Sequence, residues 1–233
     1  MKISQIFTLL VFVLSALTIS GCASTYQARS VETSSGFLDD YSILKKGTWS
    51  QALLVYINPQ ANEMCKKYTK VLLEPVTIWV KDKSSLEKVS EEDRQMLTDY
   101  LYDSLKEALG KDYEIVDRAG PDVLRVRAAL TEADGSLVVL DTITSVVPIA
   151  LGVSTLKQLV FGTASFVADA SIELEAQDSL TQTTLVALVD RRAGGKGWSK
   201  KFNKWGKVEK AFDYWAEKAQ TRLASCRAGE LEV

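Results

Sequence analysis

The chain has 233 residues, a formal net charge of −2 at pH 7 and 46% hydrophobic residues. A chain of this size buries roughly 70% of its unfolded surface and forms one ordinary hydrophobic core. Nothing in this balanced net charge indicates a nucleic-acid partner, which calls for a clustered basic excess, so none is expected.

The N-terminus predicts a lipoprotein signal peptide over residues 1–21. Lys2 gives a positive start, and the apolar stretch 6–14 is too short for a bilayer span, which takes about 20 residues. The segment ends on Ile19-Ser-Gly-Cys22, which resembles a bacterial lipobox, in which the Cys is acylated and becomes the mature N-terminus. The alternatives are an ordinary signal peptide with an incidental Cys, or a buried helix.

The expected modification is a covalent diacylglycerol and palmitate on Cys22, and no other cofactor is expected. Two lipid signals suffice for stable anchoring where one is marginal. Residue 23 is Ala rather than Asp, which by resemblance to enterobacterial sorting favours the outer membrane over the inner one. We therefore expect a lipid-anchored protein on the periplasmic face of the outer membrane.

A polar run follows the lipidation site and is too hydrophilic for a core. It predicts a lipidated N-terminus and flexible tether over residues 22–50, with Phe37, Leu38 and Tyr41 docking it onto the domain. Residues 51–233 then form a single periplasmic domain.

The first half of this domain shows one strong helix between strands. The run 71–80 is β-rich, and Pro75 suggests an edge or a bend there. Ser90 opens a helix in which leucines recur every four residues up to Gly110. Short β-like residues 113–117 follow, and residues 122–133 alternate with arginines on the outer side, as in a strand with one wet face.

The second half predicts a hairpin and a terminal helix. Residues 165–178 alternate between apolar and polar, and residues 185–189 are apolar on both faces, as in a central strand. A short loop joins them, which favours an antiparallel pair. Apolar residues recur at helical spacing over 208–223. The sequence therefore predicts an α+β fold, with one mostly antiparallel twisted sheet and helices packed on one face.

Several motifs resemble a domain-of-unknown-function family of Gram-negative lipoproteins. They are SGFLDDYSIL (35–44), DVLRVRAALTEAD (122–134), SFVADASIELEAQDSLT (165–181), VDRRAGGK (189–196) and KWGKVEKAFDYWA (204–216). The resemblance spans essentially the whole mature chain and implies no established activity. More distantly, the order of elements is similar to periplasmic domains of the TolB N-terminal type and to the curli secretion channel lipoprotein, which is fold analogy alone.

Cysteine use suits an oxidising compartment. Besides Cys22 the chain has Cys65 and Cys226, an even pair that the periplasm permits to form a disulfide. Two free buried thiols are the alternative.

The sequence offers no catalytic or metal site. It has no His, which removes the commonest general base and the usual zinc ligand. The acidic pairs are explained by solvation and by helix-dipole complementarity. We expect that the protein is not an enzyme, with no catalytic residues and no metal.

Two segments are candidate contact surfaces. The run 191–210 combines eight basic residues with aromatic ones, which suits anionic lipid or a partner, although a solvated loop is the alternative. Its candidate contacts are Arg191, Arg192, Lys196, Lys200, Lys201 and Lys204. The apolar run 142–162 is a core helix or buried linker, an oligomer interface or, least favoured, a membrane-inserted segment.

The leading functional hypothesis is a binding protein that serves as an accessory or assembly factor of an envelope complex, through a protein partner or self-association. A structural homo-oligomeric scaffold is the alternative. An enzyme that works with carboxylates alone is less favoured, because it requires a concave pocket with two close acids, one of raised pKa.

Overall fold

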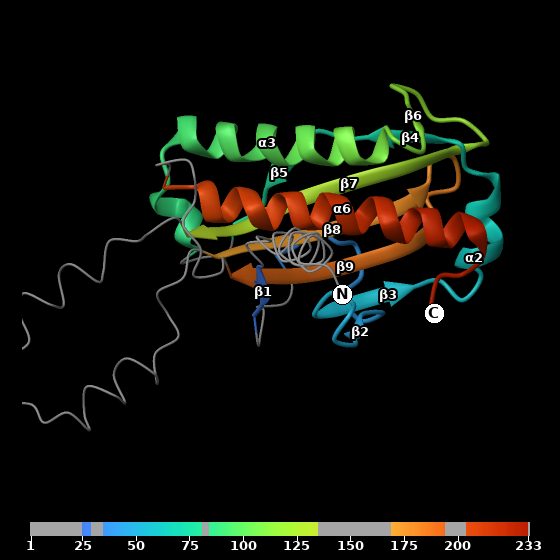
Figure 1. Ribbon diagram of the computed structural model, residues 1–233, viewed down its shortest axis with the longest axis horizontal. Coiled ribbons are helices and arrows are strands. Elements are labelled where there is room, and N and C mark those ends of the chain that lie inside the picture. The colour runs from blue at the N-terminus through green and yellow to red at the C-terminus, as the bar shows by residue number, and fades with distance from the viewer. Residues whose placement is uncertain (1–24, 29–34, 81–83, 135–168, 194–203, 233) are drawn as a thin grey trace, which may run out of the picture.

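The computed structural model describes residues 25–28, 35–80, 84–134, 169–193 and 204–232. Over these residues the chain forms one sheet with helices packed against it, the α+β fold that the sequence predicts (Figure 1). In chain order the elements are β1 (Tyr26–Gln27), β2 (Lys45–Lys46), β3 (Leu54–Ile57), α2 (Ala61–Met64), the 3-10 helix η1 (Cys65–Lys67), β4 (Lys70–Leu73), β5 (Thr77–Ile78), the 3-10 helix η2 (Ser85–Lys88), α3 (Glu91–Leu109), β6 (Glu114–Ile115), β7 (Val123–Asp134), β8 (Asp169–Asp178), β9 (Thr184–Ala193) and α6 (Gly206–Ala228).

The described strands follow the order β2-β3-β9-β8-β7-β4-β6, with β1 beside β9 and β5 beside β7. The long strands β7, β8 and β9 are antiparallel neighbours, and β3 pairs antiparallel with β9. Strand β4 runs parallel to both β6 and β7, and β5 runs parallel to β7. Because antiparallel pairings predominate and include the longest strands, the prediction of a mostly antiparallel sheet is confirmed.

The predicted strands are present, but one of them is divided into two short strands. The run 71–80 forms two short strands, β4 and β5, which flank Pro75, since proline has no N–H to donate to a ladder. Strands β8 and β9 form the predicted antiparallel hairpin. Residues 165–168 of the first predicted hairpin strand lie outside the described residues.

Helix α3 begins where the sequence predicts. The Ser90 hydroxyl accepts a hydrogen bond from the backbone N–H of Asp93, which satisfies a donor that a helix start leaves unpaired. The leucines at four-residue spacing are all fully buried: Leu97, Leu101, Leu105 and Leu109. This repeat therefore faces the core, where α3 packs against α6 and the sheet.

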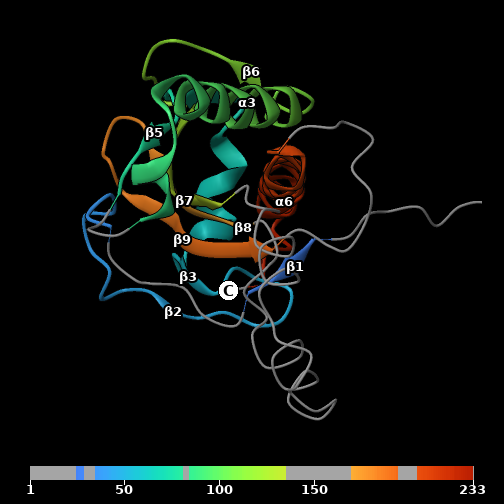
Figure 2. The ribbon, with the colours of Figure 1, turned by 90° about the vertical axis from the view of Figure 1, so that its left-hand side faces the viewer.

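Helix α6 is longer than predicted and ends at Gly229, which has a φ of 79°, in the left-handed region that favours glycine. Phe212 and Trp215 are buried between α6 and the rest of the core, with their rings stacked 6.0 Å apart. Helices α3 and α6 lie side by side on the same face of the sheet (Figures 1 and 2). The predicted placement of the helices on one face is confirmed.

The opposite face of the sheet is covered by residues 35–44, so it is not the wet face expected from the alternation. Phe37 and Leu38 are buried there against Ala129, Ala187 and Val189. In Figure 2 this blue segment runs along the side of the sheet away from the helices. The alternation predicts a solvent-facing side because a local pattern gives no indication of a distant segment that lies over the polar side chains.

The folded domain includes residues that precede the boundary expected at residue 51. Residues 35–44 belong to the second core cluster, and β2 pairs with β3 inside the sheet. Residues 25–28 also contact the domain, since β1 pairs with β9. The described residues of the segment predicted as a tether are therefore part of the fold.

Candidate functional site

The predicted contact residues are only partly within the described chain. Cys22, Lys196, Lys200, Lys201 and the run 142–162 lie outside the described residues. Arg191, Arg192 and Lys204 are described, and all three have partners within the domain.

Arg191 and Lys204 each form ion pairs. The Arg191 guanidinium lies 2.5 Å from Asp169 and 3.5 Å from Glu132. The Lys204 ammonium lies 2.6 Å from Asp93, close to the start of α3. These two charges are therefore neutralised in part by the protein itself, and they stabilise the end of the sheet and the α3–α6 contact.

Arg192 is buried and holds Thr25, which precedes strand β1. Its guanidinium lies over the Tyr214 ring, 3.5 Å from the ring centroid. It also donates hydrogen bonds to the side-chain and backbone oxygens of Thr25, at 2.8 and 2.9 Å. The N-terminal strand β1 is thus held against β9 and α6 at one end of the domain.

An apolar groove lies between α6 and the sheet in the described structure. On this face Val55 and Ile57 of β3 and Val186 and Leu188 of β9 are only half-buried. Alternate residues of β9, which point to the other face, are fully buried, so the helix layer leaves β3 and part of β9 uncovered. The resulting cavity has a volume of about 120 Å³.

We call this hollow the α6 groove and define it by its lining residues. Its floor comes from β3, β8 and β9, and its wall comes from α6. The lining residues are Ser50, Gln51, Ala52, Val55, Ile57, Leu109, Val126, Ile172, Leu174, Ala176, Val186, Leu188, Asp190, Tyr214, Trp215, Lys218, Ala219, Arg222, Leu223, Cys226 and Leu231.

Asp190 is the one acid among these lining residues, and its carboxylate is already occupied. It accepts hydrogen bonds from the Trp215 indole at 2.8 Å, the Gln27 amide at 2.9 Å and the Leu53 backbone N–H at 3.2 Å. These bonds tie α6, β1 and the start of β3 to β9. The geometry assigns Asp190 a structural role.

Lys218 and Arg222 bring positive charge to the groove. They stand four residues apart on α6, so they share one face of the helix. Arg222 donates to the Ser50 backbone oxygen at 3.1 Å, and Lys218 lies 5.7 Å from the centroid of the Tyr214 ring. Between described residues, no ion pair joins either cation to a carboxylate.

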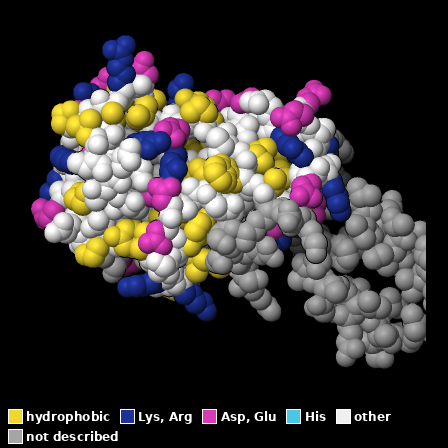
Figure 3. Space-filling model, turned by 180° about the vertical axis from the view of Figure 1, so that it is seen from behind, with side chains coloured by type: hydrophobic (Ala, Val, Ile, Leu, Met, Phe, Trp, Pro, Cys, Tyr) yellow, Lys and Arg dark blue, Asp and Glu magenta, His cyan; other side chains and the backbone are white. Residues whose placement is uncertain are grey.

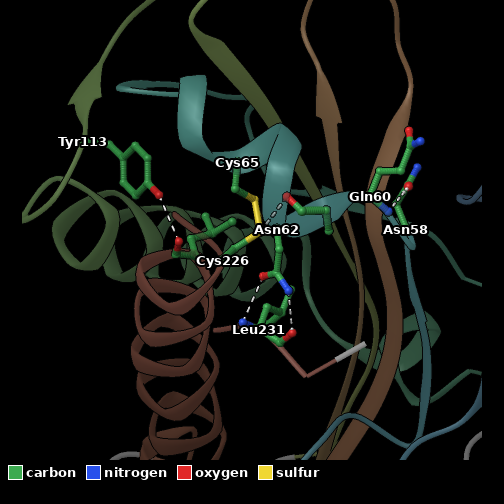
Figure 4. Close-up of a disulfide and its surroundings, with 9 residues drawn as sticks. Asn58, Gln60, Asn62, Cys65, Tyr113, Cys226 and Leu231 are labelled. Carbon is green, nitrogen blue, oxygen red and sulfur yellow. Dashed lines mark hydrogen bonds between the residues drawn. A yellow bond between two sulfur atoms is a disulfide. The ribbon is translucent and has the colours of Figure 1, made fainter. Parts of the chain in front are cut away.

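A disulfide lies beside the groove, since one of its two cysteines is a lining residue. The structure joins Cys65 to Cys226, with Cα atoms 5.6 Å apart, which links η1 to the C-terminal part of α6. Figure 4 shows the Asn62 amide beside this bridge, bonded to the backbone N–H and C=O of Leu231 at 3.0 and 2.9 Å. Cys226 and Leu231 both line the groove, so the bridge and these bonds fix this part of its lining.

The buried acids of the opposite face also have structural partners. Glu173 accepts from the Tyr41 hydroxyl at 2.5 Å and from the Ser35 backbone N–H at 3.1 Å. Burial raises the pKa of Tyr41, and the bond to Glu173 raises it further. Glu175 forms an ion pair with Arg127 at 2.6 Å. Glu173 therefore holds residues 35–44 on the sheet, whereas Glu175 joins β8 to β7.

The part of the chain that the structure describes holds no group of three or more His, Cys, Asp or Glu side chains able to bind a metal ion. Within the same residues, no helix combines the length and apolar character needed to cross a membrane. On the face seen in Figure 3, apolar side chains form several small patches separated by charged and other side chains.

The described residues form an α+β domain with an apolar groove beside α6, and comparison with known proteins gives its family. Residues 33–219 match the family described as a protein of unknown function, DUF3313. The chain belongs to this family.

Two relatives carry the description "uncharacterized lipoprotein YdcL", one from Escherichia coli strain K12 and one from Escherichia coli O157:H7. Each is 30% identical to this chain over 182 residues, which cover 77% of this chain and 78% of the relative. The predicted resemblance to a lipoprotein family of unknown function is thereby confirmed.

Solved structures give more distant likenesses. A PelC dodecamer from Paraburkholderia phytofirmans is 11% identical with a TM-score of 0.38, and covers 71% of this chain and 94% of that one. Protein XCC0632 from Xanthomonas campestris, of family DUF330, is 12% identical with a TM-score of 0.39, and covers 70% and 87%. Likeness at this level indicates nothing about activity.

Proposed function

We propose that the protein is an outer-membrane-anchored periplasmic lipoprotein that acts by binding rather than by catalysis, as an accessory or assembly factor of an envelope complex. The observation that carries the binding role is the α6 groove, an apolar hollow with two cations and one acid that is already bonded. Apolar concavities with few polar groups are the usual form of ligand sites.

Three observations support the anchored, periplasmic location. The sequence Ile19-Ser-Gly-Cys22 has the form of a lipobox. The relatives are described as lipoproteins. The Cys65–Cys226 disulfide suits a compartment in which disulfides persist, such as the periplasm.

The position of Thr25 favours a short link between anchor and domain. Arg192 holds Thr25, which is three residues beyond Cys22. Three extended residues span at most about 11 Å. The end of the domain that carries β1, the last residues of β9 and Tyr214 therefore faces the bilayer, and the domain is held close to the membrane.

The location is tested by fractionation and palmitate labelling in a Gram-negative host. We expect the parent chain to incorporate palmitate and to sediment with outer membranes, and Cys22→Ser to lose both properties. Ala23→Asp is expected to move the protein to the inner membrane, whereas the matched control Ala23→Ser keeps it in the outer one. Membrane association of Cys22→Ser equal to that of the parent would refute lipid anchoring.

The binding role is tested by placing a photo-crosslinking amino acid at Lys218 in living cells. We expect crosslinks to a recurrent cellular component from this position, since Lys218 lies at the groove. Glu217 is the matched control, because it is exposed on the same helix but does not line the groove. Equal products from both positions would contradict a specific role for the groove.

A further inference from the structure

We infer that the α6 groove binds the hydrocarbon chain of an anionic single-chain amphiphile, with Lys218 and Arg222 receiving its negatively charged head. This inference rests on the proposed binding role of the groove and specifies its ligand. The occupant is identified by three features of the groove, namely its apolar surface, its size and its charge.

The surface of the groove is suited to hydrocarbon. Val55, Ile57, Val186 and Leu188 remain half-buried beside α6, so their apolar surface is left in contact with solvent. Apolar area transferred from water contributes about 25 cal/mol per Å². An apolar ligand therefore gains free energy by covering these side chains, whereas a polar one loses its own hydration.

The size of the groove favours a slender chain. The cavity holds about 120 Å³, and an engineered apolar cavity of about 150 Å³ accepts benzene. A stretch of a few methylene groups has a similar bulk, and the remainder of a longer chain can extend out of the groove.

The charge at the groove selects the head group. Lys218 and Arg222 are like charges at a spacing of four residues, an arrangement that costs a helix a few tenths of a kcal/mol. Asp190, the lining acid, is buried and already holds three donors. A carboxylate or phosphate placed between the two cations relieves their repulsion, which a neutral or cationic amphiphile cannot do.

The acyl chains of the protein's own anchor are the main competing occupant. Tyr214 contacts Arg192, which holds Thr25, and Tyr214 also lines the groove. An acyl chain attached to Cys22 therefore has a short path to the groove. Those chains are joined through uncharged thioether, ester and amide groups, which leave the two cations without a counter-charge. The charge of the groove therefore favours an external anionic ligand.

The test uses the full mature chain with Cys22→Ser, which releases it from the membrane, and three probes of equal chain length. The probes are 11-bromoundecanoate, 11-bromoundecanol and the corresponding trimethylammonium compound. Bromine quenches indole fluorescence at short range, and Trp215 lines the groove. We expect saturable quenching by the carboxylate, and binding at least several-fold weaker for the alcohol and the ammonium compound.

Charge-reversal variants test the head-group contact. Lys218→Glu/Arg222→Glu is expected to weaken carboxylate binding about tenfold and to favour the ammonium probe. The control Lys106→Glu/Lys111→Glu makes the same change in net charge at residues that do not line the groove, and it should leave binding unchanged. Equal effects of the two pairs would show that only long-range charge matters and would overturn the inference.

A groove-filling variant tests the site of the chain independently. Ala219→Leu adds bulk from α6 into the groove and should abolish quenching by all three probes while leaving the helical circular dichroism unchanged. Saturable binding that survives this substitution would overturn the inference.

The same titration on the lipidated protein in nanodiscs tests the competing occupant. If only the Cys22→Ser chain binds, the anchor occupies the groove and the inference is wrong. If no probe binds although Lys218 gives specific crosslinks in cells, the proposed binding role stands and the ligand assignment fails.

Discussion

Removal of the Cys65–Cys226 disulfide should destabilise the domain without changing its fold. The bridge joins residues separated by 161 positions, so it closes a loop that contains most of the folded chain. In the loop-entropy description a closure of this length contributes about 5 kcal/mol, and measured values are commonly about 2–4 kcal/mol. We therefore expect Cys65→Ala/Cys226→Ala to lose about 2–5 kcal/mol in free energy of unfolding.

The assay is urea denaturation of the Cys22→Ser chain, followed by circular dichroism. The two sulfurs are buried, so their removal also costs packing, and reduction of the parent protein separates the two effects because it breaks the bridge but keeps the sulfurs. The reduced parent should lose most of the stability that the double variant loses. The double variant itself should be indifferent to reductant.

A small effect of reduction would refute this reasoning. If oxidised and reduced parent chains differ by less than about 1 kcal/mol, the cross-link does not restrict the unfolded chain as the entropy description requires. The Asn62 bonds to Leu231 would then be the main support of this part of the groove lining.

Three further predictions concern buried carboxylates. Tyr41→Phe removes the hydroxyl that donates to Glu173, and we expect a loss of about 1.5–3 kcal/mol in urea denaturation because a buried charged acceptor loses a partner. Trp215→Phe removes the indole donor to Asp190, and a similar loss is expected in the same assay. Asp178→Asn should be less stable than the parent above about pH 5, and the difference should shrink as the pH falls below about 4, measured by denaturation at each pH.

The sign of the pH effect follows from the surroundings of Asp178. Burial alone raises the pKa of this carboxyl, but hydrogen bonds from Lys67, the Thr181 backbone N–H and Tyr68 outweigh it and hold the pKa well below its ordinary value. The carboxylate therefore stabilises the fold above the unfolded-state pKa, near 3.9. That stability is lost as the pH falls toward the folded-state pKa.

Matched controls and contrary outcomes are available for each substitution. Trp49→Phe should change stability by less than about 0.5 kcal/mol, because Trp49 is 94% exposed. Tyr26→Phe, at another exposed ring, serves the same purpose for Tyr41. If Tyr41→Phe and Trp215→Phe lose no more free energy of unfolding than the controls, the bonds to Glu173 and Asp190 contribute little to stability. A pH-independent difference for Asp178→Asn would show that its charge is not the stabilising feature.

Elements with local signals could be predicted from the sequence. The leucines of α3 recur with the period of a helix, and Ser90 supplies the cap, so both the type and the start of this helix follow from residues a few positions apart. The alternation of β8 and the short turn after it likewise predict a hairpin. The resemblance to a lipobox is also a local pattern, and the prediction of lipidation at Cys22 needs no knowledge of the fold.

The burial of the polar side of the sheet could be seen only in the tertiary structure. Glu173 and Glu175 alternate with apolar residues, which is also the pattern of a solvent-facing strand. Their partners, Tyr41 and Arg127, come from segments far away in the chain, and no short window of sequence relates them. The docking of Phe37, Leu38 and Tyr41 onto the domain was predictable from their apolar character. Only the structure shows that residues 35–44 belong to the second core cluster and not to a tether.

The α6 groove is likewise a product of assembly. It exists because the sheet extends beyond α6 to β3, so that helix-side residues of β3 and β9 lack a covering layer. Lys218 and Arg222 reach it because they share one face of the helix. The basic run 191–210 is a candidate contact surface by its composition alone, which does not reveal which cations line the groove. Local periodicity determined which elements form, and a short motif indicated the expected lipidation site. Long-range packing decided which surfaces were left open, since that depends on how many elements cover each face.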